Sequence, residues 1–479
     1  MVFSSLLFLF CFLPLFFAGY YLVPRPLKND FALMGSLLFY AWGAPRFVLA
    51  LILSSTLDYV LGILLHRYHG QRRTQNVLIG ISVVANVSLL LYFKYANFFV
   101  GQLNELLSSY ALPPLAWSAV ALPIGISFFT FHKLSYTIDV YRATVLPAKN
   151  FRTFLLYLAL FPQLIAGPII RYHVIEKQFA DRSHSWEMLF SGVCRFCIGL
   201  AKKILIADPL GQVADVVFGT GDATLSSSHA WLGAFAYSFQ IFFDFSGYSD
   251  MAIGLGKMMG FSFPENFDNP YIARNITEFW RRWHMTLSSW MREYLYIPLG
   301  GSRVPTWRCY LNLWTVFLLS GLWHGANWTF IIWGLYHGLF LVLDKIFWLR
   351  FSDRIFPPFR LMLTFLVVMI GWIFFRSDSI GHALTFLRTM LSFTPNLDPM
   401  AKSAFDLLSN RSLAMLILAC LLSFLPALNW PRIESRLPWV NSAWLRSPWP
   451  RGACACILLV IAAANITNSY FHPFIYFRF

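Results

Sequence analysis

The sequence predicts an all-α polytopic membrane protein, and two properties of the chain support this class. Apolar runs of about 20 residues, the length that an α-helix needs to cross the hydrocarbon core of a bilayer, recur along the sequence. The 479 residues are 58% hydrophobic and only 12% charged, and a soluble domain carries about twice that charge. The period-two alternation of a transmembrane β-barrel is missing from the sequence. The lipid bilayer is therefore the first partner that we expect.

The net charge of +15 is distributed in a way that disfavours nucleic acid as a partner. The basic residues form short runs between apolar segments, as in HRYHGQRR at 66–73, and do not gather in one patch. Cytoplasmic loops of membrane proteins carry such runs. We therefore expect the basic loops to lie on the cytoplasmic side and to set the orientation of the chain in the membrane, and we expect no nucleic-acid binding.

Helices that span the bilayer, or nearly span it, are expected at 4–23, 31–65, 77–97, 117–138, 153–170, 231–255, 361–375, 412–428 and 453–470. The run 31–65 is too long for one straight span and contains Pro45, so we expect two shorter pieces. Pro162 and Gly167 predict a broken helix in 153–170. With the central stretch described next, the chain should form roughly ten to twelve helices in one membrane domain, residues 1–479.

Two polar interruptions precede the central stretch. Asp244 and Asp250 interrupt the apolar run 231–255, and their spacing places them on different faces of a helix. Each is expected to bond to a basic group or to a helix end, and Asp244 is a candidate to orient a catalytic histidine. The segment 261–271, FSFPENFDNPY, has turn chemistry throughout.

The central stretch begins with a predicted helix from Asn275, which is placed to be its N-cap with Glu278 three residues later. Glu278 has the spacing to pair with Arg281 or Arg282. One stripe of this helix should carry Thr277, Arg281, His284, Ser288 and Arg292. The stripe is typical either of a polar wall in a cavity or of an interfacial helix whose arginines contact lipid phosphates.

The second predicted helix of the stretch is apolar from Leu311 to Trp323 and then places His324 at its end. Ser320, His324 and Asn327 should share one face at i, i+4 and i+7. A neutral imidazole is the usual general base near pH 7, and the alternative is a histidine that makes an interhelical hydrogen bond. For His337 the structural alternative is favoured.

Several other classes of site are disfavoured by the sequence. The histidines and carboxylates have no metal-ligand spacing, so no metal is expected. A nucleophile elbow and a phosphate-binding glycine loop are both missing from the sequence, which argues against a serine hydrolase or a nucleotide-driven pump. A transporter or flippase of an envelope precursor remains as the second class of function, although paired broken helices from an inverted repeat are not apparent. The aromatic tail 471–479 either lies at the membrane interface or presents the hydroxyl of Tyr476.

Several long motifs identify a known family. They are FPQLIAGPIIRY, DFSGYSDMAIGLGKMMGF, PENFDNPY, FWRRWHMTLSSWMREYLYIPLGG, SGLWHGANWTFIIWGLYHG and the terminal FIYFRF. With these the chain resembles, nearly from end to end, the membrane-bound O-acyltransferase superfamily, and most of all its bacterial branch with the alginate O-acetyltransferase membrane subunit. The resemblance implies a ring of tilted helices around a central funnel, with the catalytic core at 230–345. It also implies that His324 is the catalytic histidine and His284 the second family histidine.

The resemblance further implies a reaction. An acyl thioester, acetyl-CoA in the first place, would donate from the cytoplasmic side of the bacterial inner membrane, with no bound cofactor. The acceptor would be Tyr476 or a periplasmic acetyltransferase partner, which then acetylates an exported polysaccharide such as alginate; transfer of D-alanyl or another acyl group is the family's alternative. Arg281, Arg282 and Arg292 would hold either the CoA phosphates or lipid phosphates.

Overall fold

The computed structural model describes residues 2–221, 224–392, 403–427, 447–468 and 474–475. Among these residues the regular structure is helical throughout, in agreement with the predicted class. Contacts divide the chain into two compact units, residues 1–189 with 255–264 and residues 190–254 with 265–479. The prediction of one membrane domain is not tested by this division, and the ring of ten to twelve helices also stays a prediction.

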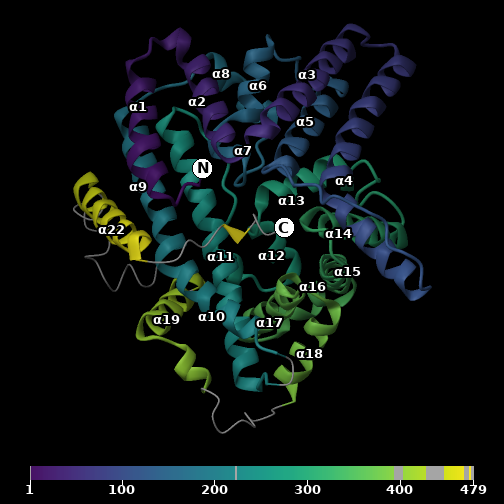
Figure 1. The fold of residues 1–479 in the computed structure, drawn as a ribbon, viewed down its shortest axis with the longest axis vertical. Coiled ribbons are helices and arrows are strands. Elements are labelled where there is room, and N and C mark those ends of the chain that lie inside the picture. The colour runs from purple at the N-terminus through teal and green to yellow at the C-terminus, as the bar shows by residue number, and fades with distance from the viewer. Residues whose placement is uncertain (1, 222–223, 393–402, 428–446, 469–473, 476–479) are drawn as a thin grey trace. The chain divides into compact units, whose positions relative to one another are not determined.

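The first unit contains eight α-helices among its described residues (Figure 1). They are α1 (Leu13–Leu22), α2 (Lys28–Gly43), α3 (Pro45–Arg67), α4 (Arg72–Ser109), α5 (Ile126–Tyr141), α6 (Phe151–Ala159), α7 (Phe161–Leu164) and α8 (Tyr172–Ala180). The break at Pro45 between α2 and α3 confirms the expected division of the run 31–65. The break between α6 and α7 likewise confirms the broken helix in 153–170. The helix expected at 117–138 begins only at Ile126.

The second unit holds most of α9 and of α11 and all later helices (Figure 1). The α-helices are α9 (Trp186–Ala201), α10 (Asp208–Phe218), α11 (Ser227–Met258), α12 (Ile276–Arg282), α13 (Met285–Met291), α14 (Thr306–His324), α15 (Trp328–Leu343), α16 (Leu349–Phe351), α17 (Pro357–Arg376), α18 (Ile380–Leu391), α19 (Asn410–Phe424) and α22 (Pro448–Asn468). Wider π-helical turns continue three of them, at Lys202–Ala207 after α9, Arg292–Tyr296 after α13 and Asp344–Trp348 after α15.

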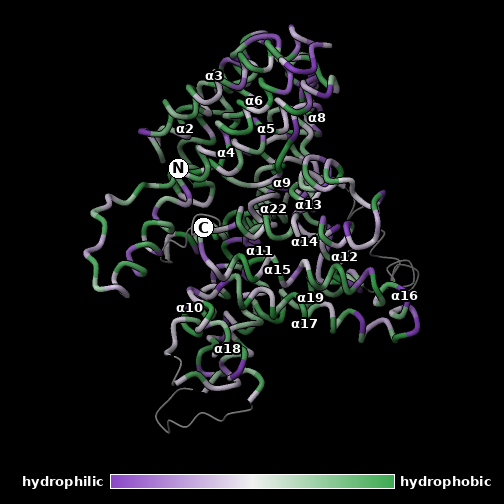
Figure 2. Tube along the Cα trace, turned by 90° about the vertical axis from the view of Figure 1, so that its right-hand side faces the viewer, coloured by the Kyte–Doolittle hydropathy of each residue, from purple (hydrophilic) through white to green (hydrophobic). Residues whose placement is uncertain are grey.

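Six helices among the described residues are long and apolar enough to cross a membrane. These segments are Pro45–Arg67, Arg72–Ser109, Trp328–Arg354, Pro357–Arg376, Asn410–Ala427 and Pro448–Thr467. Hydrophobic residues, green in Figure 2, cover most of the length of α17 and α19. The chain is therefore a multi-pass membrane protein.

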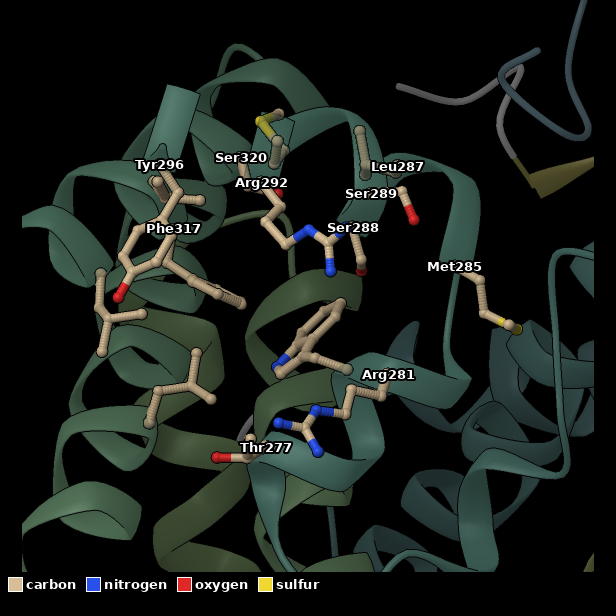
Figure 3. A pocket seen from close by; sticks show the side chains of 15 residues that line it. Thr277, Arg281, Met285, Leu287, Ser288, Ser289, Arg292, Tyr296, Phe317 and Ser320 are labelled. Carbon is tan, nitrogen blue, oxygen red and sulfur yellow. The ribbon is translucent and has the colours of Figure 1, made fainter. Parts of the chain in front are cut away.

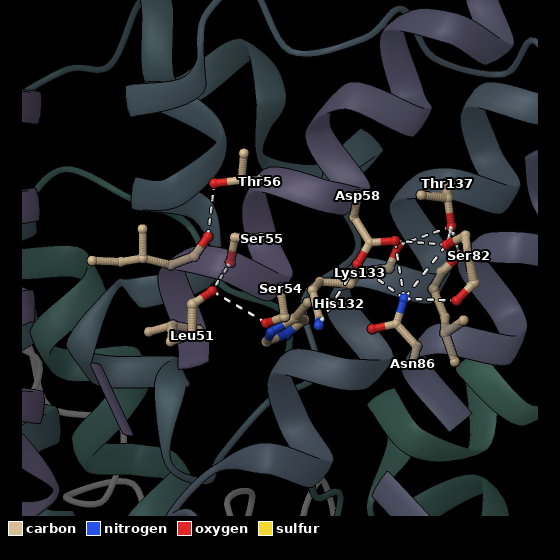
Figure 4. A network of polar contacts seen from close by, with 12 residues as sticks. Leu51, Ser54, Ser55, Thr56, Asp58, Ser82, Asn86, His132, Lys133 and Thr137 are labelled. Atoms are coloured by element: carbon tan, nitrogen blue, oxygen red, sulfur yellow. Dashed lines mark hydrogen bonds and ion pairs between the residues drawn. The ribbon is translucent and has the colours of Figure 1, made fainter. Parts of the chain in front are cut away.

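A closed polar network ties together three helices of the first unit. Asp58 of α3 accepts hydrogen bonds from Ser82 at 2.6 Å and from Asn86 at 2.9 Å, both on α4 (Figure 4). Lys133 of α5 lies 3.6 Å from the same carboxylate, and both charged side chains are buried. Thr137 of α5 accepts from the Ser82 hydroxyl at 3.1 Å. The network fixes how α3, α4 and α5 pack, because buried polar groups need partners.

In the second unit α9 and α11 cross at a pair of glycines. A Cβ added to Gly199 would lie 2.5 Å from the carbonyl oxygen of Gly247, and one added to Gly247 would lie 2.7 Å from that of Gly199. Only glycine permits two backbones to approach so closely. This contact brings the π-helical turn after α9, with Lys203, against the middle of α11.

Candidate active site

The backbone breaks at His284, and the prediction of one continuous helix from Asn275 with a single polar stripe is wrong. Asn275 does cap α12, since its side chain accepts from the Glu278 N–H at 2.7 Å. The helix then ends at Arg282, and His284 adopts the left-handed conformation with φ 44° and ψ 54° before α13 begins. Left-handed backbone is uncommon for a residue other than glycine, and such residues often lie at functional sites.

The break has a local cause in the turn segment 261–271. The Met285 N–H donates to the carbonyl of Asn266 at 2.9 Å, and the Asp268 N–H donates to the carbonyl of Arg282 at 2.9 Å. A continuous helix would use these groups in its own hydrogen bonds. The turn segment therefore pulls the chain out of the helix at His284.

Asn266 holds the imidazole of His284 in one orientation. The Asn266 amide oxygen accepts from the Thr286 hydroxyl at 2.8 Å and from the Thr286 N–H at 3.3 Å, which shows that this atom is the oxygen. The amide nitrogen donates to Ser249 at 3.0 Å. His284 Nδ1 lies 3.0 Å from the same amide oxygen and must therefore be the donor. Nε2 then carries the lone pair of the neutral ring.

Burial keeps His284 neutral. The side chain is 1% exposed, and burial lowers the pKa of His284, which lies outside the six apolar spans, to about 3. A ring with this pKa is uncharged at pH 7. The tautomer and the absence of charge together make the Nε2 atom of His284 a hydrogen-bond acceptor. Sequence analysis missed Asn266, although the polar composition of 261–271 marked the segment that contains it.

His324 is the last residue of α14 and lies in an aromatic enclosure. Its ring centroid is 4.7 Å from Trp323, 5.0 Å from Trp333 and 5.1 Å from Phe375, all edge to face. The ring of His284 lies 6.3 Å from the same Trp323. The structure thus brings the two predicted histidines to one tryptophan, from helices that are separate in the sequence.

The prediction that Asn327 shares a helix face with Ser320 and His324 is wrong, because α14 ends before Asn327. Gly325 is extended, so the helix stops after His324, and Asn327 instead caps α15 by accepting from the Thr329 N–H at 3.1 Å. Ser320 and His324 remain one turn apart on α14. Gly321 of α14 allows α15 to approach closely, because a Cβ on Gly321 would lie 2.3 Å from the carbonyl oxygen of Phe330. This close contact holds His324 against Trp333.

A cavity of about 430 Å³ lies between the α12–α13 segment and α14, and its lining residues include neither His284 nor His324. Figure 3 shows the guanidinium groups of Arg281 and Arg292 directed into it. Ser320, one turn before His324, and Met285, directly after His284, also line it. Residues from the expected stripe therefore line one cavity, while His284 itself turns away to Asn266.

The remaining predicted residues have other partners. Arg282 does not line the cavity and forms ion pairs with Glu278 at 3.0 Å and Asp268 at 2.9 Å. Asp244 pairs with Lys203 at 2.7 Å, a basic partner of the expected kind, and is bonded to none of the histidines that the structure describes.

His337 is fully buried between Trp280 and Trp333, with ring centroids at 5.0 and 5.2 Å. This position agrees with a packing role. Tyr476 lies outside the described residues. Among the described residues, no group of three or more His, Cys, Asp or Glu side chains is placed to hold a metal ion.

Comparison with known proteins places the chain in a family. The membrane-bound O-acyltransferase family model matches residues 61–380. The probable alginate O-acetylase of Pseudomonas aeruginosa is 45% identical over 393 residues, which cover 82% of this chain and 75% of the relative. The probable alginate O-acetylase of Pseudomonas putida is 41% identical over 491 residues and covers both chains completely. The peptidoglycan O-acetyltransferase of Helicobacter pylori is 34% identical over 522 residues, 100% of this chain and 98% of its own.

These similarities decide between the two classes of function that the sequence left open. A transporter or flippase is not supported, because the matching family consists of acyltransferases and the match includes the segments that carry His284 and His324. The chain is therefore an acyltransferase, and it belongs to the membrane-bound O-acyltransferase family, in the branch that contains the probable alginate O-acetylases.

Proposed function

We propose that the protein is an O-acetyltransferase of the bacterial inner membrane that serves O-acetylation of an exported polysaccharide, alginate or a similar polymer. Acetyl groups would come from acetyl-CoA on the cytoplasmic side and cross the membrane through the enzyme. The names of the relatives support acetyl over D-alanyl as the acyl group. They differ in the polymer, which suits an enzyme whose final acceptor is chosen by periplasmic partner proteins.

One observation carries the proposal: two buried histidines share Trp323, and a cavity with two arginines in its wall is lined by Met285, the residue after His284, and by Ser320, one turn before His324. A general base needs an acceptor nitrogen near the reacting atoms and protection from water. The aromatic enclosure of His324 supplies this protection.

The reaction can be written for His324 as the base. One ring nitrogen takes the proton of the acceptor hydroxyl while the hydroxyl oxygen attacks the thioester carbonyl carbon. The new C–O bond forms, the C–S bond breaks, and the leaving thiolate takes the proton back from the imidazolium. The acetyl ester and free CoA thiol are the products, and His324 returns to its starting state.

His284 suits the acceptance of a hydrogen bond better than the stabilisation of an oxyanion. Its Nδ1–H is used by Asn266, and Nε2 of the neutral ring has no proton to donate. We therefore assign His284 a role in accepting a hydrogen bond from a reacting group near His324, with Asn266 fixing its tautomer.

The cavity fits the donor better than the acceptor. Its wall includes apolar side chains such as Trp280 and Phe317, which suit the pantetheine arm. Arg281 and Arg292 are exposed at its border and suit the phosphates of CoA. Arg282 is given no such role because it does not line the cavity and is paired with both Glu278 and Asp268.

The test is His324→Ala, with His337→Ala as the matched control. Both variants remove a buried imidazole that contacts Trp333, so both create a similar packing defect. Acetyl transfer from acetyl-CoA by purified protein should fall by about a hundredfold or more in His324→Ala, the contribution of a general base, and should persist in His337→Ala. Equal transfer in the two variants, with both folded, would reject His324 as the base.

A further inference from the structure

A cysteine and a lysine that the proposed mechanism does not use are in contact near the cavity between the α12–α13 segment and α14. Cys309 Sγ lies 3.3 Å from the ammonium nitrogen of Lys345 and 3.3 Å from the hydroxyl oxygen of Tyr296. Cys309 belongs to α14, and the other two belong to the π-helical turns after α15 and α13. Three separate elements therefore bring two nucleophilic side chains together.

Lys345 has a thiol where a lysine in a protein interior usually has a carboxylate. Within the described part of the chain it forms no ion pair with a carboxylate, and the partners of its ammonium group are Cys309 and Tyr296. The neighbouring carboxylate, Asp344, instead accepts from the N–H and the hydroxyl of Thr277, at 2.7 and 2.8 Å. The natural counter-ion of this ammonium group is the Cys309 thiolate.

The contacts of Cys309, which lies outside the six apolar spans, favour that thiolate. Burial of the side chain, which is 6% exposed, opposes ionisation, but the Tyr296 hydroxyl and the Lys345 ammonium lower the pKa of the Cys309 thiol below its usual value. A thiolate, and not a thiol, attacks a thioester carbonyl. Cys309 is therefore prepared for acyl exchange at neutral pH.

The pair lies at the border of the cavity that we propose for acetyl-CoA. Tyr296 lines this cavity (Figure 3). Three residues of α14 line it as well, and Cys309 precedes them on the same helix face by four, seven and eleven residues; they are Leu313, Val316 and Ser320. Eleven residues correspond to about 16 Å of helix, so Cys309 lies far from the end of the wall that is next to His324.

The surroundings of the pair are basic. Exposed arginines precede Cys309 and follow Lys345 in the sequence; they are Arg303, Arg308, Arg350 and Arg354. Such runs are typical of the cytoplasmic side of a membrane protein. This composition favours the side from which the thioester donor is proposed to come.

We propose that Cys309 and Lys345 form a self-acetylation site, in which the thiolate takes an acetyl group from acetyl-CoA and passes it to the lysine. The inference rests on the proposed function for the identity of the donor. In the first step the bond from Sγ to the acetyl carbon forms, the C–S bond to CoA breaks, and the CoA thiolate takes a proton from the Lys345 ammonium. The products are an acetyl thioester on Cys309, a neutral lysine and free CoA thiol.

In the second step the neutral amine of Lys345 attacks the acetyl carbon on Cys309. The C–N bond forms, the C–S bond breaks, and one amine proton moves to the sulfur, so that the cysteine is recovered as a thiol. The 3.3 Å contact between the two nucleophiles makes this transfer intramolecular. The lysine is left as an uncharged amide.

The experiment uses the full-length protein in lipid nanodiscs with acetyl-CoA as the probe and locates acetyl groups by mass spectrometry of peptides. Cys309→Ser removes the thiolate at nearly constant volume. Lys345→Arg keeps the positive charge beside the thiol but supplies no nucleophilic amine. Lys202, which pairs with Asp250 at 2.7 Å, is the internal control for direct acetylation of a lysine.

In the wild type, Lys345 should be acetylated about tenfold or more faster than Lys202, because transfer from the adjacent sulfur is intramolecular. Cys309→Ser should lower the rate at Lys345 to that at Lys202. Lys345→Arg should retain the acetyl group on Cys309 as a thioester, which hydroxylamine removes.

A second measurement tests the thiolate in the folded protein without acetyl-CoA. The rate of alkylation of Cys309 by iodoacetamide is followed against pH, with the buried Cys197 as control, because burial raises the pKa of that thiol to about 11. A lowered pKa keeps the thiolate populated at lower pH, so the midpoint for Cys309 should lie below that of an ordinary cysteine. Lys345→Met should raise the midpoint, and Lys345→Arg should keep it low.

Three results would overturn the inference. They are an undiminished acetylation of Lys345 in Cys309→Ser, a rate at Lys345 no higher than that at Lys202, and an unchanged alkylation midpoint in Lys345→Met. Failure of the proposed function is distinguishable from these results. In that case the wild type transfers no acetyl group to a hydroxyl acceptor, whereas acetylation of Lys345 needs only the thiolate and the amine and should persist in His324→Ala.

Discussion

Each unit of the protein buries one lysine against aspartate, and the two clusters differ in how the carboxylates are completed. In the first unit Lys133 lies 3.6 Å from Asp58, and the carboxylate takes its hydrogen bonds from Ser82 and Asn86 (Figure 4). In the second unit Lys203 lies 2.7 Å from both Asp208 and Asp244. The first cluster pairs one lysine with one carboxylate, whereas the second places one lysine between two carboxylates.

This difference indicates two uses of the same pair of side chains. The Asp58 cluster is completed by side chains of α3, α4 and α5 and therefore joins helices. The Lys203 cluster is completed by a backbone N–H at the far end of the chain. A buried ion pair whose remaining hydrogen bonds come from neighbouring helices joins those helices. A buried ion pair whose second carboxylate oxygen accepts from a distant segment is able to control where that segment binds.

The largest effect is expected for Lys203→Met. The substitution leaves two buried carboxylates facing each other, so the free energy of unfolding should fall by about 3–5 kcal/mol. Denaturant unfolding of the detergent-solubilised protein measures this loss, and Lys203→Arg should recover part of it. If Lys203→Met were as stable as the wild type, the lysine would not be needed to hold the two carboxylates in the interior.

A smaller effect is expected for Lys133→Met. Asp58 keeps its donors Ser82 and Asn86 in this variant, so the loss should be about 1–3 kcal/mol. The double variant Lys133→Met, Asp58→Asn should be more stable than Lys133→Met, because no charge is left buried. A loss equal to that of Lys203→Met would show that the two clusters do not differ in the predicted way.

The smallest effect is expected for Thr137→Val. This change removes one hydroxyl from the edge of the Asp58 cluster without a large change of shape, and Ser82 still donates to Asp58. The free energy of unfolding should fall by about 0.5–1.5 kcal/mol, with acetyl transfer unchanged. Transfer that falls with Thr137→Val would contradict a purely structural cluster in the first unit.

The helical class, the break at Pro45 and the broken helix around Pro162 were predictable from the sequence, because apolar length and proline act locally. The N-cap at Asn275 was predictable for the same reason. The break at His284 was not predictable from the sequence. Hydrogen bonds with residues 266–268 cause it, and no pattern within 275–297 indicates these hydrogen bonds.

The candidate site was predictable in its histidines but not in its geometry. Residue type and family resemblance singled out His284 and His324, and their common contact with Trp323 depends on tertiary packing. Helical spacing misplaced Asn327 because α14 ends at His324. The sequence also did not predict Lys203 as the partner of Asp244. The two side chains meet only because Gly199 and Gly247 allow α9 and α11 to pack closely.

The left-handed backbone at His284 restricts which amino acids can replace it. Most side chains are strained at φ 44°, by about 1–2 kcal/mol, whereas glycine and asparagine accept this region readily. An alanine scan would therefore mix loss of the imidazole with a displaced turn. Asparagine at 284 removes the imidazole while keeping the chain path, so it is the substitution that isolates the chemistry of this position.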